Sequence, residues 1–256
     1  EALSRLQCLS RLELHCDSED CSSLVNGITE LPHLTALRVT LGCDSTGGAG
    51  YKGAAEAMGK LVQLTYFKLE LSKDSLNGEE GQAAIEAIGK LRQLTSFNLG
   101  EQANLDKRHR ELIVKNLVGL QQLSRLELHS DPVTCKAIVE SAAELPHLTT
   151  LHLTLGHDGT GGAEYMAVAE AVGRVAQLKT LHLTLGDVSL SGEEGRAVLE
   201  AVGRLRPLTG LNIGQDNYIG AAGCAQLRNL QNLTSLSIGL GNSLGRKGLK
   251  YLRELP

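Results

Sequence analysis

Residues 178–208 read LKTLHLTLGDVSLSGEEGRAVLEAVGRLRPL and carry two different hydrophobic periods. From Leu181 to Leu185 every second residue is a leucine, which indicates a strand with one buried face. Further on, Val198 and Val202 lie four positions apart, as they would on one side of a helix. One strand, one turn and one helix therefore form a unit. Such a unit buries its apolar face only when copies of it stack on either side.

The chain contains these copies. Each begins at a leucine that is followed by apolar residues three and five positions later, and this leucine occurs at positions 9, 34, 64, 94, 123, 148, 178, 208 and 233. The first four spacings are 25, 30, 30 and 29 residues, and the next three repeat the 25, 30 and 30. About half of the residues are identical between the first block and the positions 114 residues later. We expect one array over 1–256, built from two four-repeat blocks, 9–122 and 123–232, and a ninth repeat. Its last residues resemble the start of a further repeat, which predicts that the array belongs to a longer chain.

The order of the predicted elements defines an α/β fold. Helices are expected at 53–61, 80–91, 108–118, 135–144, 165–175, 194–205, 221–230 and 246–254. A strand joined through a helix to the next strand favours a parallel sheet with all helices on one side. Because helices are wider than the spacing of about 4.8 Å between strands, the stack is expected to curve. The prediction is a horseshoe-shaped solenoid with the sheet on the concave side and the helices on the convex side.

Composition excludes several classes of function. The formal net charge is −4, and lysine and arginine are mixed with aspartate and glutamate, so there is no basic stripe for nucleic acid. No run approaches the 20 or so apolar residues of a membrane span, and the N-terminus has no signal-peptide pattern. The six cysteines form no CxxC pair and no dense disulfide framework. Free thiols in a reducing, cytoplasmic compartment are expected.

The pattern LxxLxLxL, a loop with glycine or asparagine, and then EGxxxLxxxLxxL resembles the ribonuclease-inhibitor-like class of leucine-rich repeats. The long strands of LTTLHLTLG (148–156) and LKTLHLTLG (178–186) are similar to arrays found in protist proteins. The asparagine or cysteine that this class places just after the strand is mostly missing, and Asn217 is the clearest example that remains. The resemblance implies recognition of a protein on the concave face and implies no catalysis.

Candidate binding residues follow from the strand positions that should point into the concave face. Tyrosine and arginine are frequent anchors of interfaces, and charged or aromatic side chains gather in the N-terminal half of this face. The predicted partner-binding residues are Arg11, Arg38, Tyr66, Lys68, Glu70, Arg125, His152 and His182.

Two of these residues, His152 and His182, occupy equal positions on adjacent predicted strands, about 4.8 Å apart. No third ligand completes a tetrahedral site around them, so no metal site is predicted. Two neighbouring imidazoles would instead make binding sensitive to pH near neutrality.

No catalytic motif is present: the chain has no GxSxG, no HExxH and no Cys and His pair on one predicted surface. The glycine-rich loop at 42–48 lacks the lysine of a phosphate-binding loop, so no cofactor is expected. The sequence therefore predicts a non-catalytic scaffold for a protein partner, with no nucleic acid and no membrane span, possibly within a larger complex. The alternatives are a regulator of an enzyme, such as a GTPase-activating or nuclease-inhibiting array, and an architectural subunit of a large assembly.

Overall fold

The computed structural model describes residues 6–16, 27–41, 49–71, 79–100, 105–156, 162–185 and 193–255. The chain forms two compact units, residues 1–127 and residues 128–256. The boundary between the two units falls within strand β5 (Arg125–Ser130), so this strand has residues in both.

The first unit alternates strands and helices. Its described strands are β1 (Arg11–Cys16), β2 (Ala36–Leu41), β3 (Tyr66–Leu71) and β4 (Ser96–Leu99). Its described helices are α2 (Ala49–Met58), α3 (Glu79–Ile88) and α4 (Lys107–Leu117). The strands are parallel and pair in register, so that Glu13, Arg38, Lys68 and Asn98 lie side by side.

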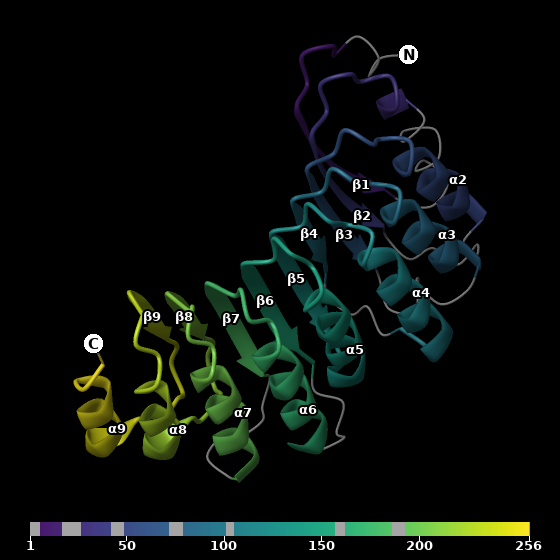
Figure 1. Cartoon of the computed structure of the whole chain (residues 1–256). Helices are drawn as coiled ribbons and strands as arrows, with labels where there is room; N and C mark the ends of the chain where they lie inside the picture. The colour runs from purple at the N-terminus through teal and green to yellow at the C-terminus, as the bar shows by residue number, and fades with distance from the viewer. Residues whose placement is uncertain are drawn as a thin grey trace. The chain divides into compact units, whose positions relative to one another are not determined.

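The second unit continues the same alternation. Its strands after β5 are β6 (Thr150–Leu155), β7 (Thr180–Leu185), β8 (Gly210–Ile213) and β9 (Ser235–Ile238). Its helices are α5 (Pro132–Ala142), α6 (Gly162–Gly173), α7 (Glu193–Gly203), α8 (Gly220–Leu227) and α9 (Gly245–Leu252). Strand order follows chain order from β1 to β9, and within each unit the helices lie on one side of the strands (Figure 1). This is the predicted fold, a leucine-rich-repeat solenoid.

The alternation of leucines explains why each sheet has two different faces. In β6, Leu151, Leu153 and Leu155 are buried, whereas the residues between them are partly exposed. The leucine that opens each repeat is also buried, and Leu64 and Leu178 have no exposed surface. Full burial of one such side chain stabilises the fold by roughly 1.5–3 kcal/mol. The leucines therefore form the core between sheet and helices and leave the other strand side chains available for contacts.

The helix boundaries differ from those predicted by the hydrophobic pattern. We expected a helix at 80–91, but α3 ends at Ile88, and Leu91 lies in a turn where its N–H donates to the carbonyl oxygen of Ile88. Leu91 is nevertheless fully buried, so the apolar spacing continues past the end of the helix. Helix starts were predicted too late. In α5 the start is Pro132, after the N-cap Asp131 whose side chain accepts from the N–H of Thr134 at 2.9 Å.

Asparagine side chains join neighbouring repeats in the second unit. The predicted Asn217 accepts a hydrogen bond from the N–H of Leu185 at 2.7 Å and donates to the carbonyl oxygen of Gly214. A second asparagine, Asn242, also donates to Gly214 at 2.8 Å and is 3% exposed. The sequence analysis did not single out Asn242. Its signal was the shared pattern Gly-x-x-Asn-x-x-Gly at 214–220 and 239–245.

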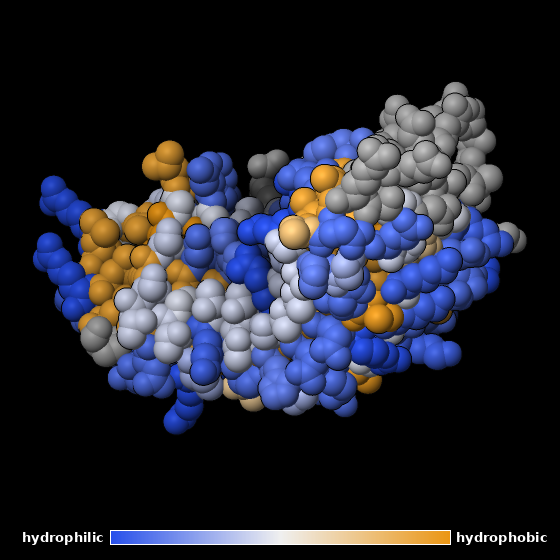
Figure 2. All heavy atoms as spheres, turned by 90° about the horizontal axis from the view of Figure 1, so that it is seen from above, coloured by the Kyte–Doolittle hydropathy of each residue, from blue (hydrophilic) through white to orange (hydrophobic). Residues whose placement is uncertain are grey.

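The last strand, β9, differs from the strand before it in the burial of its apolar residues. Leu236 and Ile238 are partly exposed, whereas the paired Leu211 and Ile213 of β8 are buried. Leu240, just after β9, is 80% exposed, and apolar side chains gather at this end of the second unit (Figure 2). Among the described residues, no helix combines the length and the hydrophobicity that crossing a membrane requires.

Three cysteines can be described. Cys8 is exposed, Cys135 and Cys224 are buried, and all three are free thiols. Burial raises the pKa of both buried thiols. Cys21 and Cys43 and the side chain of Cys16 lie outside the described part of the chain.

Candidate functional site

Strand side chains that no helix covers form the open sheet face, a name used here for each unit separately. In the first unit this face consists of Arg11, Glu13, His15, Ala36, Arg38, Thr40, Tyr66, Lys68 and Glu70. Five of the eight predicted partner-binding residues belong to it. They come from three adjacent strands, because equal positions in a parallel register face the same way.

Arg38 lies at the centre of an ion-pair network on this face. Its Nη1 is 3.0 Å from Oε1 of Glu13 on β1, and its Nη2 donates to both carboxylate oxygens of Glu70 on β3 at 3.1 Å. Lys68 contacts the same carboxylate, with its Nζ 2.7 Å from Oε1 of Glu70. Two cations and two anions from three strands thus hold one another in fixed positions.

Glu70 is the most perturbed carboxylate of the network. Its side chain is only 24% exposed, and Thr40 donates a further hydrogen bond to it at 2.8 Å. Partial burial raises the pKa of Glu70, but hydrogen bonds from Lys68, Thr40 and Arg38 outweigh this effect and lower the pKa to about 2. The hydrogen bond to Glu70 likewise raises the pKa of Arg38. The carboxylate therefore stays ionised throughout the neutral pH range.

A hollow of about 280 Å³ lies beside the network. It is lined by Arg11, Leu12, Glu13, Ala36, Leu37, Arg38 and Tyr66. The register places Ala36 between Arg11 on β1 and Tyr66 on β3, so a small side chain separates two large ones. The hollow thus has an aromatic wall on one side and guanidinium groups on the other. Aromatic rings and guanidinium groups are the side chains that most often anchor protein interfaces.

The three other predicted residues lie away from this hollow. Arg125 is on β5 and forms an ion pair with Glu127 at 3.3 Å. His152 and His182 lie on the open sheet face of the second unit, on β6 and β7, in register as predicted. Their ring centroids are 5.0 Å apart and their planes are inclined by 45°. Within the described residues, no group of three or more His, Cys, Asp or Glu side chains is arranged to hold a metal.

Sequence analysis missed three members of the network in the first unit, namely Glu13, Thr40 and His15. Glu13 contacts both Arg38 and His15, and its Oε1 is 3.1 Å from Nε2 of His15. The signal was available in the register, because Glu13 pairs with Arg38 and Thr40 pairs with Glu70 on adjacent strands. The glycine-rich loop at 42–48 lies outside the described residues.

Comparisons with known proteins found two solved structures of similar fold. One is a protein from Bacteroides fragilis, with 17% identity and a TM-score of 0.52, matched over 93% of this chain and 67% of that one. The other is TLR13 in a complex with ssRNA13, with 19% identity and a TM-score of 0.49. This match covers 99% of the chain but only 32% of TLR13. No family model matches the sequence, and no curated protein matches it either.

Proposed function

We propose that the chain is a non-catalytic scaffold that binds a protein partner through the open sheet face of its first unit. The observation that carries this proposal is the hollow beside Tyr66 together with the ion-pair network centred on Arg38. The proposal places the chain in the ribonuclease-inhibitor-like class of leucine-rich repeats and in a reducing, cytoplasmic compartment. The buried free thiols Cys135 and Cys224 are consistent with such a compartment.

The charges of the network favour a protein over a nucleic acid. Arg38 and Lys68 are each within 3.1 Å of a carboxylate oxygen, so their charge is already compensated by Glu13 and Glu70. A phosphate backbone approaching this face would meet two carboxylates beside the two cations. Mixed charges around an aromatic side chain suit a protein surface, which presents groups of both signs.

The network also reduces the cost of binding. An unrestrained arginine loses rotamer entropy when a partner fixes it, at roughly 0.5–1.5 kcal/mol for each side chain. Arg38 is held by Glu13 on one side and by Glu70 on the other. A partner therefore meets a guanidinium group whose position is already set. Lys68, with its side chain 20% exposed, contributes mainly by holding Glu70.

The open sheet face of the second unit is proposed to contribute a pH-dependent contact through His152 and His182. With ring centroids 5.0 Å apart, two imidazolium charges would repel each other. A partner that contacts the neutral pair would therefore bind more weakly as the pH falls below about 6.5. The readout is the dissociation constant between pH 5.5 and 8, compared with that of His152→Gln.

The experiment for the main proposal compares variants of two surfaces. The wild-type chain is used to isolate a partner, and affinity is then measured for Tyr66→Ala and Arg38→Ala. Lys52→Ala and Glu56→Ala, both exposed on α2 on the helix side, serve as controls. Each substitution on the sheet face should weaken binding by about 1 kcal/mol or more, and the controls should leave binding unchanged. Loss of binding in the α2 variants with normal binding in Tyr66→Ala would assign the interaction to the helical surface.

A further inference from the structure

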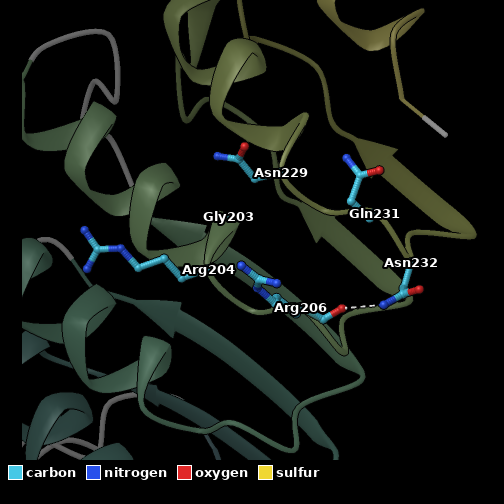
Figure 3. A pocket seen from close by; sticks show the side chains of 6 residues that line it. All are labelled: Gly203, Arg204, Arg206, Asn229, Gln231 and Asn232. Atoms are coloured by element: carbon cyan, nitrogen blue, oxygen red, sulfur yellow. Dashed lines mark hydrogen bonds between the residues drawn. The ribbon is translucent and has the colours of Figure 1, made fainter.

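A second hollow lies in the second unit, at the turns that join helices to the following strands. It has a volume of about 510 Å³ and is lined by Gly203, Arg204, Arg206, Asn229, Gln231 and Asn232. These residues come from the turns after α7 and α8 (Figure 3). None of them belongs to the open sheet face, so the hollow is independent of the function proposed above.

The hollow arises from a difference between the two blocks of repeats. Arg92 and Arg206 occupy the same position, two residues before the leucine that opens the next strand. Beside Arg92, the next turn has Gly119, and a side chain at Gly119 would overlap the Arg92 guanidinium. Arg92 therefore packs over a glycine. At the position equivalent to Gly119, the second block has Asn229, whose side chain takes up that space.

The charges around the hollow leave one arginine uncompensated. Arg204 forms an ion pair with Glu200 at 2.8 Å. Arg228, next to Asn229, forms an ion pair with Glu254 at 2.9 Å and stacks on Tyr251. Among the residues that the structure describes, the Arg206 guanidinium has no hydrogen bond or ion pair. Since no carboxylate lines the hollow, its lining attracts an anion.

The amide groups of the lining indicate which kind of anion fits. Asn232 donates through Nδ2 to the carbonyl oxygen of Arg206 at 2.8 Å, and Gln231 donates through Nε2 to that of Arg228 at 2.8 Å. Both donations leave the amide oxygens as acceptors. A phosphate group, which offers only acceptors, would face these oxygens unfavourably. A peptide offers N–H donors to them and a carboxylate to Arg206.

We infer that this hollow, the turn site, binds an acidic segment of a protein, with a Glu or Asp carboxylate on Arg206 and the segment's backbone on the amides of Asn229, Gln231 and Asn232. A guanidinium group binds a carboxylate through two parallel hydrogen bonds, which fixes its orientation. The lining contains no aromatic side chain. A nucleobase would therefore have no ring to stack on, which disfavours single-stranded RNA as the ligand.

The test uses NMR titrations of the complete chain with an acetylated, amidated (Glu-Gly)₃ peptide. The same measurement is made with (Gln-Gly)₃, inorganic phosphate and a single-stranded oligouridylate. The acidic peptide should shift the side-chain signals of Arg206 and Asn229, while (Gln-Gly)₃ should not. Arg206→Gln should weaken binding by roughly tenfold or more. Asn229→Asp, which adds a like charge beside the bound carboxylate, should have an effect in the same direction.

Arg92→Gln is the matched control, because it removes the equivalent arginine of the first block, and it should change the affinity by less than about twofold. The inference is overturned if no signal of the turn site shifts or if Arg206→Gln binds the acidic peptide as tightly as wild type. It is also overturned if phosphate or the oligonucleotide binds these residues more tightly than the acidic peptide does.

Discussion

Replacing Glu70 with glutamine tests the ion-pair network of the first unit. The substitution keeps the shape of the side chain but removes the charge that Arg38 and Lys68 share. Because the folded pKa of Glu70 lies below its ordinary value, its ionisation stabilises the fold. That contribution is complete above the unfolded pKa, and it is lost as the pH falls through the folded pKa.

The magnitude follows from the pKa shift of Glu70. A pKa of about 2 against an ordinary value of 4.5 is a difference of roughly 2.5 units. At about 1.4 kcal/mol per unit, this sets an upper limit of about 3 kcal/mol. Exposed ion pairs contribute less than about 1 kcal/mol, and the Glu70 side chain is 24% exposed. We therefore expect Glu70→Gln to lower the free energy of unfolding by about 1–3 kcal/mol at pH 7.

The assay is urea denaturation of wild type and Glu70→Gln between pH 7 and pH 3. The difference in unfolding free energy should be constant down to about pH 5 and then shrink as the pH approaches 2. Glu56→Gln, an exposed substitution on α2, should change stability by less than about 0.5 kcal/mol. A carbon-13 titration of the Glu70 carboxylate gives its pKa directly. A measured value near 4.5, or a stability difference that does not depend on pH, would refute the reasoning.

Three further predictions concern the core, the asparagine contact and the thiols. Leu151→Ala should lower the unfolding free energy by about 2–5 kcal/mol, whereas Leu236→Ala in the partly exposed β9 should cost less than half as much, as measured by chemical denaturation. Asn217→Ala leaves the N–H of Leu185 without its acceptor, so thermal unfolding should show a loss of about 1–3 kcal/mol. Mass spectrometry after brief alkylation should find Cys8 modified, while the buried Cys135 with its raised pKa reacts only after unfolding.

The fold could be predicted from the sequence because its signal is repeated nine times. A leucine every second residue fixes which strand face is buried, and Leu151, Leu153 and Leu155 are buried as that rule requires. Helix ends could not be predicted from the same signal. Leu91 is buried whether it belongs to the helix or to the turn, so the spacing of apolar residues does not distinguish the two.

The contents of the site were less predictable than its position. The spacing of strands placed Arg38 beside Glu13 and placed Glu70 beside Thr40. Selecting residues by type alone left out Glu13 and Thr40, which hold the selected ones in place. The turn site was harder to find, because Arg206 and Arg92 look equivalent in the sequence. Only the packing of Gly119 against Arg92 shows that the two arginines have different surroundings.

Pairing between strands that follow one another in sequence has a consequence for how the molecule folds and changes. The N–H of Thr65 bonds to Thr35 and that of Thr209 bonds to Lys179, both 30 residues back in the chain. Contacts over such short loops form quickly, so a folding nucleus in any pair of repeats can grow by adding neighbours. For the same reason, insertion or deletion of one whole 30-residue repeat preserves every junction type, and such a variant should remain folded.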